Sequence, residues 1–416
     1  MGRQAPPIVN PDYGFFPNRW QVNGPSLRAT GVLYIENLNK GANMKVLSSV
    51  RVVEIGGIGP GPFCAMHLAD LGADVISVVR PLPLQAPNPA RTVLNRGKRS
   101  VTADLKSPQG RDAVLRLVEH ADVLIEGMRP GVMEELGLGP EVCARRNPKL
   151  VYGRMTGWGQ HGPLAHAAGH DNNYISVSGA LWHAGPAGQR PVTPFTVTGD
   201  IGGGALYLAV GLLSGLLQAR ATGRGTVVDA SIVDGSAHML NLLLHARHSG
   251  LVGDERGASI HDSSPFYETY VCADGEHITI GSIEPQFYAL LLAQLGLQHD
   301  ADFQSPQWDR STWPRRRARL AAIFLSRTRA QWQQDMEGSD ICFGAVLRPA
   351  EAARHPHNLA RGVYQEPDGV LQTSPTPRFD GAAYAPGAMA AGGEHTGAVM
   401  AQIGTGDGSA VWRDPR

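Results

Sequence analysis

The chain has 416 residues, enough for two or three domains that each bury an ordinary core. Lys plus Arg and Asp plus Glu both number 37, so no net charge steers the protein toward nucleic acid or an anionic membrane, and any anion site must be built locally. The four cysteines have neither CxxC nor metal-ligand spacing, which predicts reduced, buried thiols in a cytosolic protein and no metal site.

Residues 1–45 are rich in Pro, Gly and Asn and contain no continuous apolar run, so we interpret them as an N-terminal extension and not as a signal peptide. The final residues, VWRDPR, are no peroxisomal address. These features predict a cytoplasmic protein. One uncharged run, residues 201–219, is about long enough to span a membrane, but its five glycines favour a buried helix.

Strand-like and helix-like segments alternate from residue 46 onward. The runs RVVEI, ADVISVV, DVLIEG and KLVYGRMTG have the pattern of strands, and helical patterns stand between them. The apolar runs are unbroken by polar positions, which is typical of strands buried on both faces. This pattern predicts an α/β fold with a Rossmann-like parallel sheet.

A different pattern begins near residue 265. FYETYVCADGEHITIGSI predicts two alternating strands joined at Asp274-Gly275, a strong hairpin signal. Helical patterns follow, and the basic cluster Arg315 to Arg319 in the second of them is predicted to be a solvated helix face. Beyond residue 350 the chain is rich in loops, and SPTPRF predicts a late strand that returns toward the first domain.

The junction EIGGIGPGPFC follows a predicted strand and opens a helix, like a dinucleotide-binding turn. It departs from that motif because Pro62 replaces the third glycine and the next strand ends in Arg80, where an acidic residue would hold a ribose. An arginine there prefers a phosphate or stacks on adenine, which argues against NAD and leaves coenzyme A or NADP. Further cations near predicted strands suggest a phosphate site at one sheet edge: Arg96, Lys98, Arg99, Lys106 and Arg129.

Two titratable side chains, one histidine and one aspartate, could transfer protons in catalysis. His170, next to Asp171 in AGHDNNY, either starts a helix or moves a proton. Asp200 in TGDIGGG has the features of a helix N-cap. A capping aspartate should have a lowered pKa, which makes it a poor proton donor. The glycines at 202–204 point to a ligand instead, since they let the backbone approach one closely.

Several blocks resemble the family III CoA-transferase superfamily, and within it the branch that racemises acyl-CoA thioesters. The resemblance runs in order from about residue 46 to about residue 380, on VVEIGGIGPGPFCAMHLADLGADV, LNRGKRSVTADLK, DVLIEGMRPGVMEELGLGP, RMTGWGQHGPLAHAAGHDNNY, TGDIGGG, DGSAHM, SPFYETYVCADG and GSIEPQFY. It implies a large nucleotide-binding-like domain completed by the chain's end, a small α+β domain, and two subunits interlocked like links of a chain. Each active site would lie between the large domain of one subunit and the small domain of the other.

The resemblance also implies a division of the chain and a set of site residues. The segments are an extension at 1–45, a large CoA-binding domain at 46–230 completed by about 370–405, a linker helix region at 231–265, a small domain at 266–350, and a return segment with the C-terminal tail at 351–416. The catalytic residues would be His170, Asp200 and Glu284. Contacts to CoA would come from Arg80, Ala103, Asp104, Leu105, Lys106, Arg129, Gly169, Asp171, Asn172, Asn173 and Tyr174. The chain departs from the family at Asn172, at the shortened loop Ser263-Ser264-Pro265, and at CFGAV, residues 342–346.

The implied reaction interconverts (2R)- and (2S)-2-methylacyl-CoA thioesters by a two-base 1,1-proton transfer through an enolate. It needs carriers on opposite faces of the carbon, which His170 and Asp200 would supply, and amides at a helix start, around Asp171, to hold the enolate oxygen. CoA is part of the substrate, so no separate cofactor is expected. Two alternatives stay open: a CoA-transferase in which Asp200 is the nucleophile, and a non-catalytic acyl-CoA-binding relative.

Overall fold

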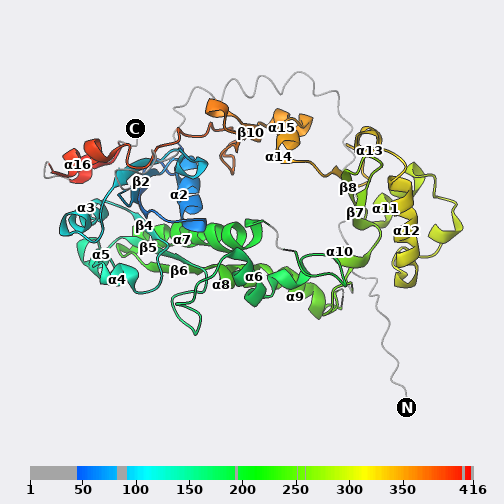
Figure 1. The fold of residues 1–416 in the computed structure, drawn as a ribbon, viewed down its shortest axis with the longest axis horizontal. Helices are drawn as coiled ribbons and strands as arrows, with labels where there is room; N and C mark the ends of the chain where they lie inside the picture. The colour runs from blue at the N-terminus through cyan, green and yellow to red at the C-terminus, as the bar shows by residue number, and fades with distance from the viewer. Residues whose placement is uncertain are drawn as a thin grey trace, which may run out of the picture.

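The computed structural model describes residues 45–81, 91–192, 195–250, 252–257, 259–404 and 408–413, so nearly all of the predicted N-terminal extension lies outside the described residues. A six-stranded sheet forms the large domain (Figure 1), with every neighbouring pair parallel and the order β3-β2-β1-β4-β5-β6. The strands are β1 (Arg51–Ile55), β2 (Asp74–Val79), β3 (Arg99–Thr102), β4 (Val123–Glu126), β5 (Val151–Thr156) and β6 (Val227–Ser231). The predicted parallel sheet is confirmed.

Helices cover both faces of this sheet, which explains its unbroken apolar strands. On one face, α2 (Pro60–Asp70) and α7 (Leu206–Thr222) bury Leu68 and Leu212 against alternate strand residues such as Val52. On the other face lie α3 (Pro108–Val118), α5 (Pro140–Arg146) and, from the far end of the chain, α16 (Thr396–Gly404). The four inner strands β2, β1, β4 and β5 therefore contribute to two apolar cores, while the edge strands β3 and β6 contribute to one each.

A small domain follows, with its own core. The hairpin of β7 (Tyr267–Val271) and β8 (His277–Gly281) is joined through Asp274-Gly275, as predicted, and Gly275 has φ +77°. A third antiparallel strand, β9 (Phe343–Ala345), pairs with β8. Aromatic residues, including Phe266 and Phe324, pack between these strands and the helices α11 (Pro285–Gln294), α12 (Trp313–Phe324) and α13 (Arg329–Met336).

Two predictions about the small domain need correction. Arg316 of the basic cluster is fully buried, because its guanidinium donates to the carbonyl groups of Asp302, Ser305 and Pro306. Cys342 is exposed, whereas the other three cysteines are buried as predicted, and all four are free thiols.

The return segment runs from the small domain back across to the large one (Figure 1, orange) through α14 (Pro349–Ala352), α15 (Pro356–Arg361), β10 (Tyr364–Gln365) and β11 (Gln372–Thr373). The strand predicted at SPTPRF is wrong: residues 374–379 form no strand, and β11 just before them pairs only with β10. Contact with the large domain is made by side chains instead, since buried Arg96 donates to the side chain of Gln372 and to the carbonyl of Thr373.

Within the described residues, one helical stretch, Val197–Thr222, has the length and apolar composition to cross a membrane. Its α7 part buries one face on the sheet, as predicted, through residues such as Leu208 and Leu216. Leu206, Val210 and Leu217 on the same helix remain exposed. The prediction of a buried helix therefore holds for one face only.

The remaining helices connect the domains and carry the site: α4 (Val132–Glu135), α6 (Asp171–Ser178), the π-helix η4 (Val197–Ala205), α8 (Ile232–Met239), α9 (Asn241–His248) and α10 (Ile260–Ser263). The backbones of η4 and α8 touch, because a Cβ added to Gly235 would lie 1.8 Å from the carbonyl oxygen of Gly203. This contact fixes the segment that contains Asp200.

Gly235→Ala should therefore destabilise the large domain, by about 1 to 3 kcal/mol, since the added methyl group meets backbone that cannot move aside alone. Thermal unfolding of the two proteins measures the loss. Gly397→Ala is the matched control: Gly397 lies in α16 with open space around its missing Cβ, and alanine there should leave the melting temperature unchanged or slightly higher. Equal melting temperatures for Gly235→Ala and the parent would contradict the tight contact.

Candidate functional site

The strand order reverses between β1 and β4, and ligands of open parallel sheets bind at such a point, outside the carboxyl ends of the strands. The turn after β1 contains Gly59, which precedes α2 and has φ +73°. A Cβ on Gly59 would lie 3.4 Å from the Oδ2 atom of Asp200. Asp200, which comes from η4, therefore reaches the point where the topology alone predicts a ligand.

Asp200 is not the helix N-cap that its sequence context predicts. It lies within η4, whose N-cap is Thr196, and its backbone N–H donates to Oδ2 of Asp171 at 2.7 Å. The N-cap prediction fails because of this long-range hydrogen bond. The bond occupies the Asp200 amide, and the Asp200 carboxyl group faces the turn at Gly59. π-Helical segments of this kind are frequent at functional sites.

The electrostatic surroundings make Asp200 easier to protonate than an ordinary aspartate. Burial raises the pKa of Asp200, the neighbouring Asp171 carboxylate raises it further, and His170 lowers it. Asp171 is 5% exposed, and its Oδ1 atom is buried without a hydrogen-bond partner. A carboxyl group with a raised pKa keeps its proton to a higher pH than an ordinary aspartate and can give it to a substrate.

His170 is the N-cap of α6, and its imidazole is on an exposed residue. The backbone N–H of His170 donates to Oδ1 of Asn173 at 3.0 Å, while the N–H groups of Asn173 and Tyr174 donate back to the His170 carbonyl. Helix geometry leaves the amides of Asp171 and Asn172 without intrahelical acceptors. The same turn thus begins the helix, presents an imidazole, and offers two amide donors.

Tyr174 packs tightly beside this turn. Its hydroxyl donates to the carbonyl of Gly169, and its ring stands edge-on to Trp158 at 4.8 Å between centroids. A Cβ on Gly157 would lie 2.0 Å from the ring, so only glycine fits there. Sequence reasoning named neither Gly157 nor Trp158 as a site residue, although a glycine that ends a predicted strand and precedes a tryptophan is a usable signal.

Arg129 belongs to the same neighbourhood. The pKa of Tyr174 is raised first by burial and then by the Asp200 carboxylate, and the charge of Arg129 lowers it. Arg129 is exposed in the turn after β4, the second strand of the switch point. The structure therefore brings together the predicted residues His170, Asp171, Tyr174, Asp200 and Arg129.

The other predicted CoA contacts lie along the carboxyl edge of the sheet, toward β3. Arg80 follows β2, and the run 103–106 follows β3, where the Ala103 N–H donates to the carbonyl of Val79. Arg80 and Lys106 are exposed, as is Asp104, while Ala103 is buried and Leu105 half-buried. An elongated ligand could follow this edge from β3 to β4.

The predicted phosphate-binding role is wrong for three of the cations. Arg96, Lys98 and Arg99 precede or begin β3, at the amino edge of the sheet, and each is buried and paired with a carboxylate: Asp70, Glu54 and Asp74, respectively. Their charges are neutralised by these carboxylates inside the fold. Only Arg80, Lys106 and Arg129 of the predicted cations lie at the carboxyl edge.

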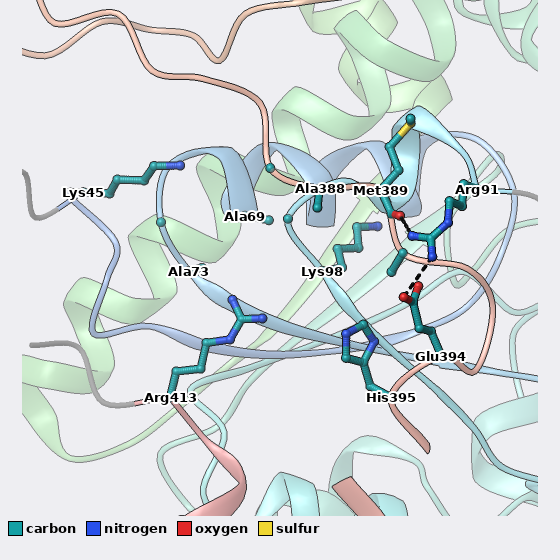
Figure 2. A pocket seen from close by; sticks show the side chains of 14 residues that line it. Lys45, Ala69, Ala73, Arg91, Lys98, Ala388, Met389, Glu394, His395 and Arg413 are labelled. Carbon is teal, nitrogen blue, oxygen red and sulfur yellow. Dashed lines mark hydrogen bonds and ion pairs between the residues drawn. The ribbon is translucent and has the colours of Figure 1, made fainter. Parts of the chain in front are cut away.

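A cavity of about 410 Å³ lies at the opposite, amino edge of the sheet (Figure 2). Figure 2 shows Arg91 bound to the carbonyl of Met389 and to Glu394, both in the return segment. Lys98 in its wall is held by Glu54. The two Arg91 contacts fasten the return segment to the large domain. Across the ranges that the structure describes, His, Cys, Asp and Glu side chains nowhere gather in threes as a metal ion would require.

Glu284 lies apart from the other two predicted catalytic residues within one chain. It is exposed at the start of α11 in the small domain, which Figure 1 places far from α6 and α7. Its charge acts within the small domain, on Cys342, whose pKa is raised mainly by burial and also by Glu284. A single chain does not assemble all three.

The sequence pattern of CoA-transferase family III matches residues 47–396. The chain belongs to CoA-transferase family III. Alpha-methylacyl-CoA racemase of Mus musculus is 43% identical over 333 residues, which cover 80% of this chain and 85% of that protein. The Homo sapiens protein of the same name is 40% identical over 370 residues, covering 86% and 93%.

Among solved structures, a CAIB/BAIF family protein from Brucella suis matches with a TM-score of 0.75 at 28% identity, covering 86% of this chain and 99% of that one. The predicted family III fold, with its parallel sheet, is confirmed. Family III membership alone leaves two uses for an aspartate at position 200, proton transfer and nucleophilic attack.

Proposed function

We propose that this family III chain is a racemase that interconverts (2R)- and (2S)-2-methylacyl-CoA thioesters. The observation that carries the proposal is the meeting of His170 and Asp200 at the switch point, where burial and Asp171 raise the pKa of Asp200. The relatives at 43% and 40% identity, both named alpha-methylacyl-CoA racemase, support it.

The reaction moves one proton off C2 of the acyl group and returns one to the other face. One carrier takes the C2 proton, and the electron pair of that C–H bond shifts into an enolate whose negative charge lies on the thioester oxygen. The amides of Asp171 and Asn172 donate to this oxygen. The second carrier then protonates C2 from the opposite face, so the pair ends with its protons exchanged and the carbon inverted.

His170 and Asp200 are the two carriers in this scheme. An imidazole can accept a proton from C2, and the raised pKa of Asp200 favours its protonated form, which can give one. In the reverse direction the roles exchange. The CoA part of the substrate binds along the carboxyl edge of the sheet, at Arg80, the run 103–106 and Arg129, and no separate cofactor is required.

Glu284 completes the site in an interlocked homodimer, in which the small domain of one subunit approaches the large domain of the other. This arrangement is supported by the distance of α11 from α6 within one chain (Figure 1). It is also supported by large apolar side chains that the chain leaves exposed on its central helices: Val177, Leu206, Val210, Leu217, Leu242 and Leu244. The cytoplasmic location stays a prediction.

A family III CoA-transferase would use Asp200 differently, as an ionised nucleophile that attacks the thioester and forms a mixed anhydride. The raised pKa of Asp200 extends the pH range over which its carboxyl group is protonated, and a protonated carboxyl group is a weaker nucleophile than a carboxylate. The imidazole of His170 also has no part in that reaction.

One incubation separates the two reactions. A single 2-methylacyl-CoA epimer is mixed with the protein and an isotopically labelled carboxylic acid, and both the epimer ratio and the labelled thioester are followed. We expect the epimers to equilibrate while the label stays in free acid. Label appearing in CoA thioester without change in the epimer ratio would replace the racemase by a transferase.

The Asp171 carboxylate gives a further, pH-dependent prediction. Asp171→Asn keeps an oxygen for the Asp200 N–H but removes the negative charge that raises the pKa of Asp200, so that pKa should fall. In the direction in which Asp200 takes the proton, the rate rises with pH as the carboxyl ionises. The acid limb of kcat/KM in that direction should therefore move to lower pH.

Asp112→Asn is the control for this shift, since Asp112 is exposed on α3 and pairs only with Arg116 of its own helix among the contacts described. Its pH profile should match that of the parent. An acid limb that moves to higher pH in Asp171→Asn would refute the role given to the Asp171 charge.

A further inference from the structure

The turn that carries Arg129 to the site is held at its start by a buried carboxylate. Glu126 ends β4 and is 1% exposed, and its Oε2 atom accepts the N–H of Met128 at 2.7 Å. The turn then closes on itself, because the N–H of Val132 donates to the carbonyl of Arg129 at 3.1 Å. Gly131, with φ +88°, permits the reversal into α4.

One guanidinium group ties both ends of this turn together. Arg154 of β5 lies directly across from Glu126 in the sheet register, and it is 8% exposed. Its Nε donates to Oε1 of Glu126 at 3.2 Å, and its two terminal nitrogens donate to both carboxylate oxygens of Glu134 in α4, at 2.8 and 3.2 Å. Such a fork-like, two-point contact fixes orientation as well as distance.

We propose that Glu126, Arg154 and Glu134 form a clamp that positions Arg129 to bind the anionic part of the acyl-CoA substrate. The three are positioning residues: they act through the turn at 127–131 and not on the substrate. The proposal rests on the function proposed above, because it takes Arg129 as a substrate contact.

The free-energy cost of burying the charged side chains of Glu126 and Arg154 gives independent support to this proposal. A buried carboxylate and a buried guanidinium lose hydration, and an apolar pair would often serve stability as well or better. The clamp is explained by the residue that it positions, since the turn places Arg129 close enough to Tyr174 for its charge to act on that tyrosine, on which Asp200 also acts. The nearby cation Arg146, by contrast, makes an exposed pair with Glu119 that positions no predicted site residue.

The clamp should respond to pH around neutrality. Burial raises the pKa of Glu126 to about 7, against the opposing effects of the Met128 N–H and Arg154. The charged and titratable groups that face Glu126 are Arg154 and Tyr152 of β5 and Glu134 of α4. Above pH 7 the carboxylate binds Arg154 with full charge, and as the pH falls through 7 it is protonated and this bond weakens.

The test compares Arg154→Met and Arg154→Lys with the parent, with Arg146→Met as the matched control on the same domain. We expect Arg154→Met to raise KM for acyl-CoA about tenfold or more while kcat changes little, Arg154→Lys to lie between, and Arg146→Met to match the parent. Glu126→Gln should bind acyl-CoA with a KM that no longer depends on pH between 6 and 8, whereas the parent's KM rises as the pH falls.

Hydrogen exchange of the backbone amides at 127–132, measured on the unliganded proteins, tests the clamp without turnover. Faster exchange in Arg154→Met, confined to this turn, and weaker affinity for free CoA by calorimetry are the expected results. Unchanged exchange and unchanged CoA affinity in a folded Arg154→Met protein would overturn the clamp. A parent that binds CoA but does not racemise would overturn the proposed function alone, because the exchange and affinity differences would persist.

Discussion

Replacing His170 with alanine lowers kcat/KM for epimerisation by about 10²- to 10⁴-fold, the usual contribution of a positioned proton carrier. The imidazole stands at the start of α6, close enough to Asp200 in the adjoining η4 that its protonated form lowers the pKa of Asp200. Without it, one face of C2 has no base. The loss is measured by chiral separation of the two 2-methylacyl-CoA epimers after incubation with either one.

The fold should survive His170→Ala, because the side chain is exposed and the backbone N–H of residue 170 keeps its bond to Asn173. His166→Ala provides the matched control, since His166 is an exposed histidine in the loop just before and should be replaceable without loss. A His170→Ala protein that epimerises at the parent's rate would remove the imidazole from the mechanism.

Asp200→Asn should separate exchange from inversion. His170 remains able to remove the C2 proton from its own face and return a solvent-derived one to that face, but the amide at 200 cannot deliver a proton to the other. We expect epimerisation to fall by about 10²- to 10⁴-fold, while one epimer still gains deuterium from heavy water with its configuration retained.

Asp234→Asn is the comparison for this change, because Asp234 is an exposed carboxylate on α8, the helix packed against η4. It should behave as the parent. Full epimerisation by Asp200→Asn would show that another group serves the second face. A mixed anhydride trapped on Asp200 of the parent would instead assign it to CoA transfer.

The sheet could be predicted because its signal is local. Apolar runs such as DVISVV are buried on both faces, and Asp274-Gly275 dictates a tight turn whatever surrounds it. Arg316 shows the limit of local reasoning: its acceptors are carbonyls 10 to 14 residues away, and a run of arginines on a helix does not reveal that one of them points inward.

The same difference between local sequence signals and long-range contacts applies to the candidate site. The sequence predicts His170 both as a helix start and as a proton carrier; the structure confirms the helix start, and the proton-carrier role stays a prediction. The environment of Asp200 is not visible, because it depends on Asp171, 29 residues earlier, and on the contact of Gly203 with Gly235. The prediction for Arg96, Lys98 and Arg99 is wrong because these residues precede or begin β3. The sequence alone does not show whether a cation near a predicted strand lies at its amino end or at its carboxyl end.

Glu284 marks the part of the site that no single chain contains. Nothing in EPQFY distinguishes a first-turn glutamate from a catalytic one, and in one chain α11, whose N-cap is Glu284, lies far from α6 (Figure 1). Its role depends on the partner subunit of the proposed interlocked dimer, and the clamp at Arg154 would act in each large domain separately.

The measurement that tests the central claim most directly is deuterium incorporation at C2 during turnover in heavy water, started separately from each 2-methylacyl-CoA epimer. A racemase with two carriers predicts that both epimers give the same final mixture, and that deuterium enters C2 in step with inversion from either side. Equilibration of the epimers without deuterium, or no exchange and no inversion across a range of branched acyl-CoA thioesters, would contradict it.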